Sequence, residues 1–216
     1  GLGDVYKRQK QATVCTGKKE AARVFDVGIK GDKIVLFAEG EAVPEAKRTI
    51  EAKGWILAPG FIDPHASTGF GYFFPKAADH KLYQGITTEI FGNCGTSPGP
   101  IGPHLIDTMN RISHEMGFPF DWKSMGEYFE RIEDRLQFNI ASLVGHSTLR
   151  GGEMEDWKNL ESETLESMKD ALDQAMREGA LGLSTGLIYA PGCFAELEEI
   201  IELTKVAAKH GGIYAS

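Results

Sequence analysis

The hydrophobic pattern of the chain changes character near residue 54. Before this point apolar and polar residues alternate, as in RVFDVGI at residues 23–29 and KIVLF at residues 33–37, with a Gly-Asp pair between the two runs. Alternation with a period of two on either side of a tight turn predicts a β-hairpin. Residues 10–54 are therefore expected to form a small β-rich domain.

Beyond residue 54, short apolar runs alternate with longer helical stretches. The runs predict strands at residues 55–62 (interrupted by Pro59-Gly60), 87–92, 138–144, 182–185 and 212–215. Strands that are apolar on both faces and alternate with helices are typical of a parallel sheet covered by helices. Eight such strands close a (β/α)8 barrel of about 250 residues. The pattern therefore predicts an α/β fold, in which residues 55–216 form a partial TIM-like barrel of about strands 1–5.

Helical periodicity is clearest in three of the stretches that separate these runs. In residues 125–132 apolar side chains recur at intervals of three and four, and Ser124 with the glutamate three residues later matches a capping box. Residues 163–178 repeat the pattern and are followed by Gly179, a favoured helix-ending residue. The last stretch, before Gly211, carries an acidic run that is typical of a solvated helix face: Glu196, Glu198, Glu199 and Glu202.

Both ends of the chain look incomplete. Residues 1–9, GLGDVYKRQ, lack an initiating Met and follow neither period, so they are interpreted as a non-native leader and left out of the fold prediction. The chain stops at GGIYAS, residues 211–216, a strand-like run with no element after it. A barrel cut at this point is expected to expose a strand edge and its apolar interior, so that the isolated chain associates or lacks a stable fold.

Composition narrows the class of protein. The chain has 216 residues, 42% of them hydrophobic, and a formal net charge of -8 from 31 acidic and 23 basic residues. The sequence has no basic cluster interleaved with aromatics, so a nucleic-acid partner is not expected. A small-molecule substrate is expected instead. No apolar run reaches the roughly 18 residues of a membrane span. Three widely spaced cysteines suit a reducing compartment, so a cytoplasmic location is expected. The oligomeric state cannot be read from the sequence.

Polar side chains lie at the ends of four consecutive predicted strands, where the reactive groups of a (β/α)8 barrel are found. They are His65 in FIDPHAST, Cys94 in FGNCG, His146 in VGHSTLR, and Ser184 and Tyr189 in STGLIYAPG. Each has an ordinary structural reading when taken singly. Cys94 suits a small buried hydrophobe, the two histidines suit hydrogen-bonded core positions, and Tyr189 could pack on the nearby proline.

In this order and wording, the motifs together resemble the amidohydrolase superfamily, and specifically its N-acyl-D-amino-acid deacylase (D-aminoacylase) branch. The segments that carry the resemblance are DVGIKGDKI, PGFIDPH, QGITTEIFGNCGTSPGP, LVGHSTLR, GALGLSTGLIYAPG and GGIYAS. The resemblance implies zinc-dependent hydrolysis of the amide bond of N-acyl-D-amino acids, which releases a carboxylate and a D-amino acid.

The resemblance also implies a role for each candidate residue. Cys94 would ligate a tightly bound zinc ion, and a thiolate suits this metal. His65 takes the first position of a His-x-His pair that in the family belongs to a second, weaker metal site. Tyr189 would reach the substrate carboxylate, while Ser184 and His146 would line the same pocket. The catalytic Asp and the other histidine ligands are expected beyond the last residue of the chain, so the chain alone is expected to be inactive.

Ser67 stands where the second histidine of the pair is expected, which predicts one zinc ion rather than two in the full-length protein. Two alternatives remain open. One is an amidohydrolase for another amide, such as N-acyl-D-glutamate, N-acyl-D-aspartate or D-peptides. The other is a non-catalytic scaffold or binding protein that has lost its metal. Ser67 favours the scaffold, whereas the intact motifs around Cys94 and Tyr189 favour the enzyme.

Overall fold

The chain divides into two compact units, Gly1–Gly60 and Phe61–Ser216. The structure is a computed structural model that describes residues 5–38, 41–76 and 79–216. The apolar run expected as one interrupted strand at residues 55–62 forms two strands, β5 (Ile56–Leu57) in the first unit and β6 (Phe61–Asp63) in the second. The Pro59-Gly60 pair separates them, because proline cannot donate to a strand ladder.

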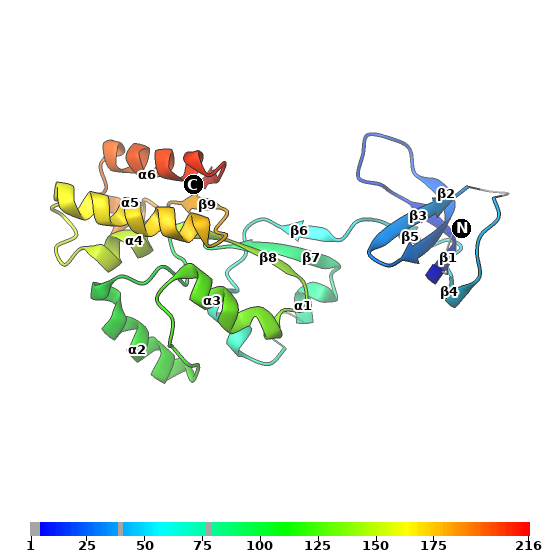
Figure 1. Ribbon diagram of the computed structural model, residues 1–216, viewed down its shortest axis with the longest axis horizontal. Coiled ribbons are helices and arrows are strands. Elements are labelled where there is room, and N and C mark those ends of the chain that lie inside the picture. Colours follow the sequence, from blue (N-terminus) through cyan, green and yellow to red (C-terminus); the bar gives the residue numbers. More distant parts are fainter. Residues whose placement is uncertain (1–4, 39–40, 77–78) are drawn as a thin grey trace. The chain divides into compact units, whose positions relative to one another are not determined.

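The first unit is a five-stranded sheet (Figure 1). Its strands are β1 (Val5–Val14), β2 (Arg23–Lys30), β3 (Lys33–Phe37), β4 (Ala46–Glu51) and β5. They lie in the order β3-β2-β1-β4, with β5 also paired to β1. The predicted hairpin is confirmed, since β2 and β3 are antiparallel neighbours. Its small core is formed by Ala12, Val14, Val27 and Ala52.

Strand β1 begins inside the segment that the sequence analysis left out of the fold. Lys7 is paired with Ile29 of β2 on one side and with Arg48 of β4 on the other. Val5, Lys7, Arg8 and Gln9 therefore have strand partners, and residues 1–4 lie outside the described residues. That residues 1–9 are non-native stays a prediction.

The second unit contains a parallel sheet whose strands follow one another in space in the same order as in the sequence. The strands are β6, β7 (Ile86–Phe91), β8 (Asn139–Gly145), β9 (Gly182–Ser184) and β10 (Ile213–Ala215). Each neighbouring pair is parallel, in the order β10-β9-β8-β7-β6. Sequential parallel strands joined by helices are the arrangement of a (β/α)8 barrel. The predicted partial barrel with about five strands is confirmed.

Helices connect these strands. They are α1 (Asp79–Leu82), α2 (Ile106–Met116), α3 (Met125–Ile132), α4 (His146–Glu153), α5 (Ser162–Arg177) and α6 (Leu197–Lys209). Helices α5 and α6 pack side by side (Figure 1). Helices α1, α2 and α4 were not predicted, and α4 starts directly at the end of β8 without a loop. Within the described ranges, none of the helices combines the length and the apolarity that crossing a bilayer requires.

Helix α3 begins at the capping box that the sequence predicted. The Glu127 N–H donates to Ser124 Oγ at 3.2 Å, and the Ser124 N–H donates to the Glu127 carboxylate at 3.0 Å. Its buried face carries Tyr128, whose hydroxyl donates to the carbonyl of Gly69. Gly69 opens a short 3-10 helix just after the His65 turn, so α3 fixes the chain on the distal side of that turn.

An aromatic cluster fills the core beside this 3-10 helix. The rings of Phe73 and Trp122 stack with centroids 5.2 Å apart, and Phe70 stacks on Phe118 at 5.3 Å. Trp122 is 1% exposed, and its indole N–H donates to the Pro98 carbonyl at 2.8 Å. Because Pro98 lies in the same loop after β7 as Cys94, the same cluster also holds the segment that carries Cys94.

Candidate metal-binding site

The residues singled out in the sequence lie at one edge of the parallel sheet. His65 follows β6, Cys94 follows β7, and His146 begins α4 at the end of β8. Ser184 is the last residue of β9, and Tyr189 lies in the loop that joins β9 to α6. Because the strands are parallel, all five positions share the carboxyl edge, where the active sites of such barrels are built.

Cys94 and His65 face each other across the ends of β6 and β7. The sulfur of Cys94 is 3.4 Å from Nε2 of His65, and Cys94 is an exposed, free thiol. Both residues line a cavity of about 270 Å3, together with Ser67, Asn93 and Phe70. Thiolate sulfur and imidazole nitrogen are the donors that zinc prefers in proteins. The pair therefore fits part of a zinc site.

A catalytic zinc ion usually has about three protein ligands. Among the described residues, no group of three or more His, Cys, Asp or Glu side chains is placed to hold a metal ion. The described part of the chain thus provides two converging donors and no third.

Close backbone packing holds the Cys94 loop. Gly92, Cys94 and Gly95 have positive φ angles of 78°, 55° and 76°. A Cβ on Gly92 would lie 2.1 Å from the carbonyl oxygen of Leu143, and one on Gly186 would lie 2.2 Å from that of Cys94. Glycine permits both the left-handed backbone and this contact between neighbouring loops, so the direction of the thiol is set by the backbone.

The turn that carries His65 is held by a buried charged cluster. Oδ1 of Asp63 accepts a hydrogen bond from the His65 N–H at 3.1 Å, and Oδ2 accepts one from Lys81 at 2.9 Å. Lys81 also donates to Glu89, which accepts a further hydrogen bond from the Thr68 hydroxyl at 3.0 Å. The hydrogen bond from Lys81 lowers the pKa of Asp63 below its usual value, despite the opposing effect of burial. One ammonium group thus connects both ends of the turn.

Lys81 and Glu89 were not among the residues that the sequence motifs indicated. Glu89 is 0% exposed, although it is a charged residue inside β7, between Thr88 and Ile90. A charged residue within an apolar strand is costly unless it is paired. That position in GITTEIF was the signal, but the partner on α1 could not be read from the strand alone.

Ser184 and His146 are buried beneath the rim. The Ser184 hydroxyl accepts a hydrogen bond from the Gly95 N–H at 3.1 Å and donates to the carbonyl of Gly92. It therefore joins β9 to both ends of the Cys94 loop. His146 is 0% exposed, with Nε2 2.7 Å from the Glu199 carboxylate. The assignment of both residues to a substrate pocket stays a prediction.

Tyr189 is exposed, in contrast to the buried Ser184 and His146. Its side chain lies in an exposed stretch with Leu187 and Ile188, and the residue is 58% exposed. The backbone on either side is nevertheless ordered by hydrogen bonds, from the Tyr189 N–H to Gly186 and from the Cys193 N–H to Tyr189. A phenol on an ordered loop is available to a ligand, and its role in substrate binding stays a prediction.

Arg150 and Glu199 form a buried ion pair that sequence analysis missed. Nη1 of Arg150 donates to one oxygen of Glu199, and His146 binds the other. Nη2 of Arg150 donates to the carbonyls of Trp157 at 2.8 Å and Phe194 at 3.4 Å. Burial alone would raise the pKa of Glu199, but the hydrogen bonds from His146 and Arg150 outweigh it and lower this pKa.

The expectation that the whole acidic run of α6 is a solvated face is wrong at Glu199, which is 2% exposed. Glu199 and the fully buried Leu203 are four residues apart and lie on the same face of α6. The apolar residue at that spacing was the signal that Glu199 points inward.

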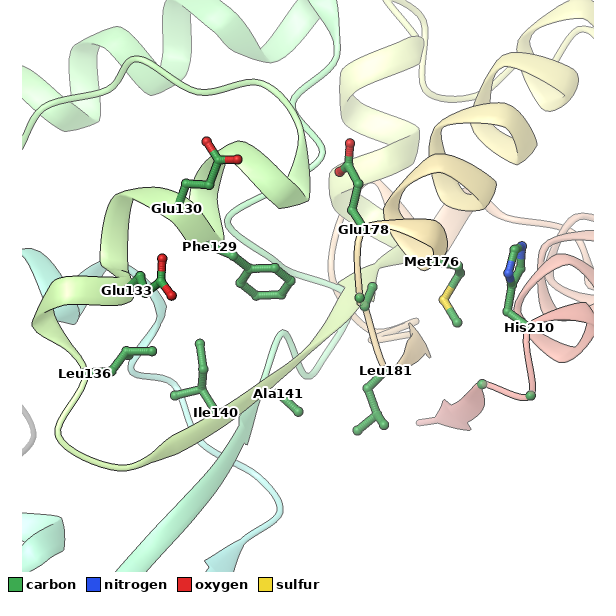
Figure 2. Close-up of a pocket in the computed structure, with 14 residues that line it drawn as sticks. Phe129, Glu130, Glu133, Leu136, Ile140, Ala141, Met176, Glu178, Leu181 and His210 are labelled. Atoms are coloured by element: carbon green, nitrogen blue, oxygen red, sulfur yellow. The ribbon is translucent and has the colours of Figure 1, made fainter.

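A second cavity, of about 570 Å3, lies at the opposite edge of the sheet and is lined by α3, β8, the turn after α5 and the end of α6 (Figure 2). Phe129 and Ile140 contribute to its apolar wall. Glu178 accepts a hydrogen bond from the Gly126 N–H at 2.8 Å, and His210 binds an aspartate of α5. These polar groups already have partners within the fold. None of the residues that line this cavity lines the one at Cys94, so it is separate from the candidate metal site.

Comparison with known proteins gives the chain its family. No family model matches it. The D-aminoacylase of Alcaligenes xylosoxydans xylosoxydans is 34% identical over 211 residues, which is 94% of this chain and 42% of the relative. The N-acyl-D-glutamate deacylase of the same organism is 36% identical over 198 residues, 90% of this chain and 40% of the relative. The chain belongs to the D-aminoacylase family of amidohydrolases.

Solved structures of this family match the whole described fold. A structure of D-aminoacylase, determined to define the role of its binuclear metal centre, has a TM-score of 0.86 and 31% identity, and covers 98% of this chain and 45% of that one. The N-acyl-D-glutamate deacylase of Bordetella bronchiseptica, complexed with zinc and a phosphonate inhibitor, has a TM-score of 0.86 at 29% identity. The chain thus spans less than half the length of these D-aminoacylase relatives.

Proposed function

We propose that the full-length protein containing this chain hydrolyses the amide bond of N-acyl-D-amino acids, releasing a carboxylate and a free D-amino acid. The observation that carries the proposal is the pair formed by the Cys94 thiol and the His65 imidazole, 3.4 Å apart at the carboxyl edge of the sheet. Its relatives include deacylases named for N-acyl-D-glutamate and N-acyl-D-aspartate as well as D-aminoacylase. All three names describe removal of an acyl group from a D-amino acid.

In this proposal Cys94 would ligate the tightly bound zinc ion, and His65 would supply a nitrogen donor of the weaker site beside it. They supply one sulfur and one nitrogen donor to the same cavity. The chemistry that zinc supplies when bound is Lewis-acid polarisation of a carbonyl and a lower pKa for water. The residues of this chain would orient these two donors. The glycine contacts of the Cys94 loop would orient the thiol, and the charged cluster behind the His65 turn would orient the imidazole.

The remaining candidates would orient the substrate. Tyr189 would donate a hydrogen bond from its phenol to the substrate carboxylate, which its exposed position at the carboxyl edge allows. Ser184 and His146 would shape the floor of the pocket, because both are fully buried beneath the loops that carry Cys94 and Tyr189.

We further propose a single zinc ion. Ser67 lines the same cavity as Cys94 and His65, but it stands where a second histidine would complete His-x-His. A neutral hydroxyl is not among the usual zinc donors, whereas imidazole is. One zinc ion is sufficient for hydrolysis of an amide.

Metal analysis of the full-length protein, expressed from its natural gene, tests the proposal. About one zinc ion per chain is expected in the wild type, lost in Cys94→Ala and kept in Cys193→Ala, which removes another exposed thiol. N-acetyl-D-amino acids should be hydrolysed and their L-enantiomers left intact. A different result would identify a non-catalytic scaffold: no hydrolysis, together with zinc that is either absent from the wild type or still bound in Cys94→Ala. Comparing acidic with apolar D-amino acids would then assign the substrate branch.

A further inference from the structure

The first turn of α4 lies beneath both loops of the candidate site. The Thr148 N–H donates to the carbonyl of Gly95 at 3.2 Å, directly after Cys94. On the other side, a Cβ added to Gly192 would lie 2.8 Å from Oγ of Ser147, so the loop after Tyr189 rests against the same turn. Helix α4 is therefore a shared support for two loops that come from different strands.

Arg150 extends this support along the second loop. It is 1% exposed, and its guanidinium reaches Glu199 at the start of α6 and the carbonyl of Phe194 just before that helix. The loop that carries Tyr189 is thus held at its beginning by Ser184 and at its end by Arg150. Burying a charge in this way is costly, and a planar guanidinium can satisfy several fixed acceptors where a lysine cannot.

We propose that Arg150 is a positioning residue, which holds the loop from β9 to α6 in place through Glu199 and the Phe194 carbonyl and so fixes the location of Tyr189. That Arg150 holds this loop in place does not depend on the proposed function. Its consequence for substrate binding rests on the proposed function, in which Tyr189 binds the substrate carboxylate.

Hydrogen exchange of the backbone amides measures directly whether Arg150 holds the loop in place. Four amides of this segment donate within it: those of Tyr189, Cys193, Phe194 and Ala195. In the full-length protein, Arg150→Lys should speed exchange in residues 186–196 about tenfold, as expected for the loss of a hydrogen bond from a charged donor. Exchange in α5 should stay as in the wild type.

Arg131→Lys is the matched control, because Arg131 pairs with Asp121 on an exposed surface of the same unit. It should leave exchange in residues 186–196 unchanged. Loop exchange that is unaltered in Arg150→Lys would overturn the proposal. So would equal acceleration in the loop and in α5, since that result would make Arg150 a general determinant of stability.

A second variant tests the support of the same loop by α4, without altering a buried charge. Gly192→Ala places a Cβ against Oγ of Ser147 and should also speed exchange in residues 186–196. Adding Ser147→Ala removes that oxygen, the nearest of the atoms that the Cβ would meet, and should restore part of the protection. Failure of this rescue would overturn the role of α4 as the support of the loop.

Kinetics of the full-length protein then separate positioning from the proposed function. Arg150→Lys should raise KM for an N-acyl-D-amino acid by about tenfold and change kcat less, because the carboxylate contact is made before the reaction. Faster loop exchange with an unchanged KM would refute the carboxylate role of Tyr189 and leave the mechanical role of Arg150 standing. A reduced kcat with unaltered loop exchange would overturn the positioning role itself.

Discussion

Single residues of the Cys94 loop are constrained by backbone geometry rather than by side-chain packing. Gly92 combines a φ of +78° with a carbonyl 2.1 Å from the position of an added Cβ. Cys94 itself has a φ of +55°, a conformation that costs about 1–3 kcal/mol for a residue with a side chain. Such a cost is tolerated where the surrounding structure determines the backbone, and here the neighbouring strands do so.

Gly92→Ala is expected to destabilise the chain by more than about 3 kcal/mol, because the clash with Leu143 adds to the left-handed backbone penalty. Gly117 is the matched control, since it has a φ of +75° and nothing within 4 Å of an added Cβ. Gly117→Ala should cost about 1 kcal/mol. Urea midpoints measure both variants, and similar losses of stability would contradict the importance of the contact.

Ser67 gives a second prediction at the residue scale. In the full-length protein, Ser67→His should add a second bound zinc ion, because an imidazole would then face the cavity lined by Cys94 and His65. Elemental analysis should rise from about one to about two zinc ions per chain. Ser67→Ala is the control and should leave the metal content unchanged. An unchanged metal content in Ser67→His would show that the serine is not what limits the site.

Two buried charged clusters join helices and strands of the second unit. Lys81 of α1 lies between Asp63 at the end of β6 and Glu89 within β7, and Arg150 of α4 pairs with Glu199 of α6. Each cluster lies behind a loop of the candidate site. In both, removal of one charge would leave an opposite charge buried without its partner.

Lys81→Met is expected to destabilise the chain by about 3–5 kcal/mol, because it leaves the Glu89 carboxylate without its main partner. Glu89→Gln in the same chain should recover part of that loss, since an amide is cheaper to bury than a carboxylate. Urea unfolding of the single and double variants gives the coupling. Additive losses would show that the two side chains act independently.

The pairing of Glu199 predicts a pH dependence. Its pKa is lowered in the folded chain below the usual value of 4.5, so its contribution to stability is present above that value and is lost as the pH falls through the folded pKa. Glu199→Gln cannot titrate. The difference in unfolding free energy between wild type and variant should therefore shrink between about pH 7 and about pH 3, and parallel curves would contradict this.

At the scale of the whole molecule, the parallel sheet ends in two open strands. β6 and β10 are the outer strands of the described sheet, and Phe61, Ile62 and Ile213 on them are 62%, 62% and 46% exposed. Open edges with apolar side chains favour pairing with another chain. The isolated 216-residue chain is therefore expected to self-associate.

Sedimentation velocity should show concentration-dependent association of the wild-type chain. Ile213→Lys should weaken it, because a charge on an edge strand opposes pairing. Tyr83→Lys is the control, since Tyr83 is 89% exposed but lies outside the strands. A wild-type chain that sediments as a monomer and melts in one sharp transition would contradict this expectation.

The elements that sequence patterns predicted are those whose signals are local. The capping box at Ser124 and the turn between β2 and β3 depend on residues within a few positions of one another. Helix α4 was missed because HSTLRGGE contains two glycines and lacks a clear apolar repeat. Its helix is supported instead by contacts with distant loops, such as the hydrogen bond to Gly95.

The sequence by itself determined the family, the five parallel strands and the candidate pair His65 and Cys94, because contiguous motifs and strand periodicity are local properties of the chain. Only the tertiary structure decided that these two side chains lie 3.4 Å apart. It also decided that Glu199 is a buried partner of Arg150, 49 residues away. The physical reason is that the partner of a buried charge depends on which distant segments pack together, and no local pattern contains that information.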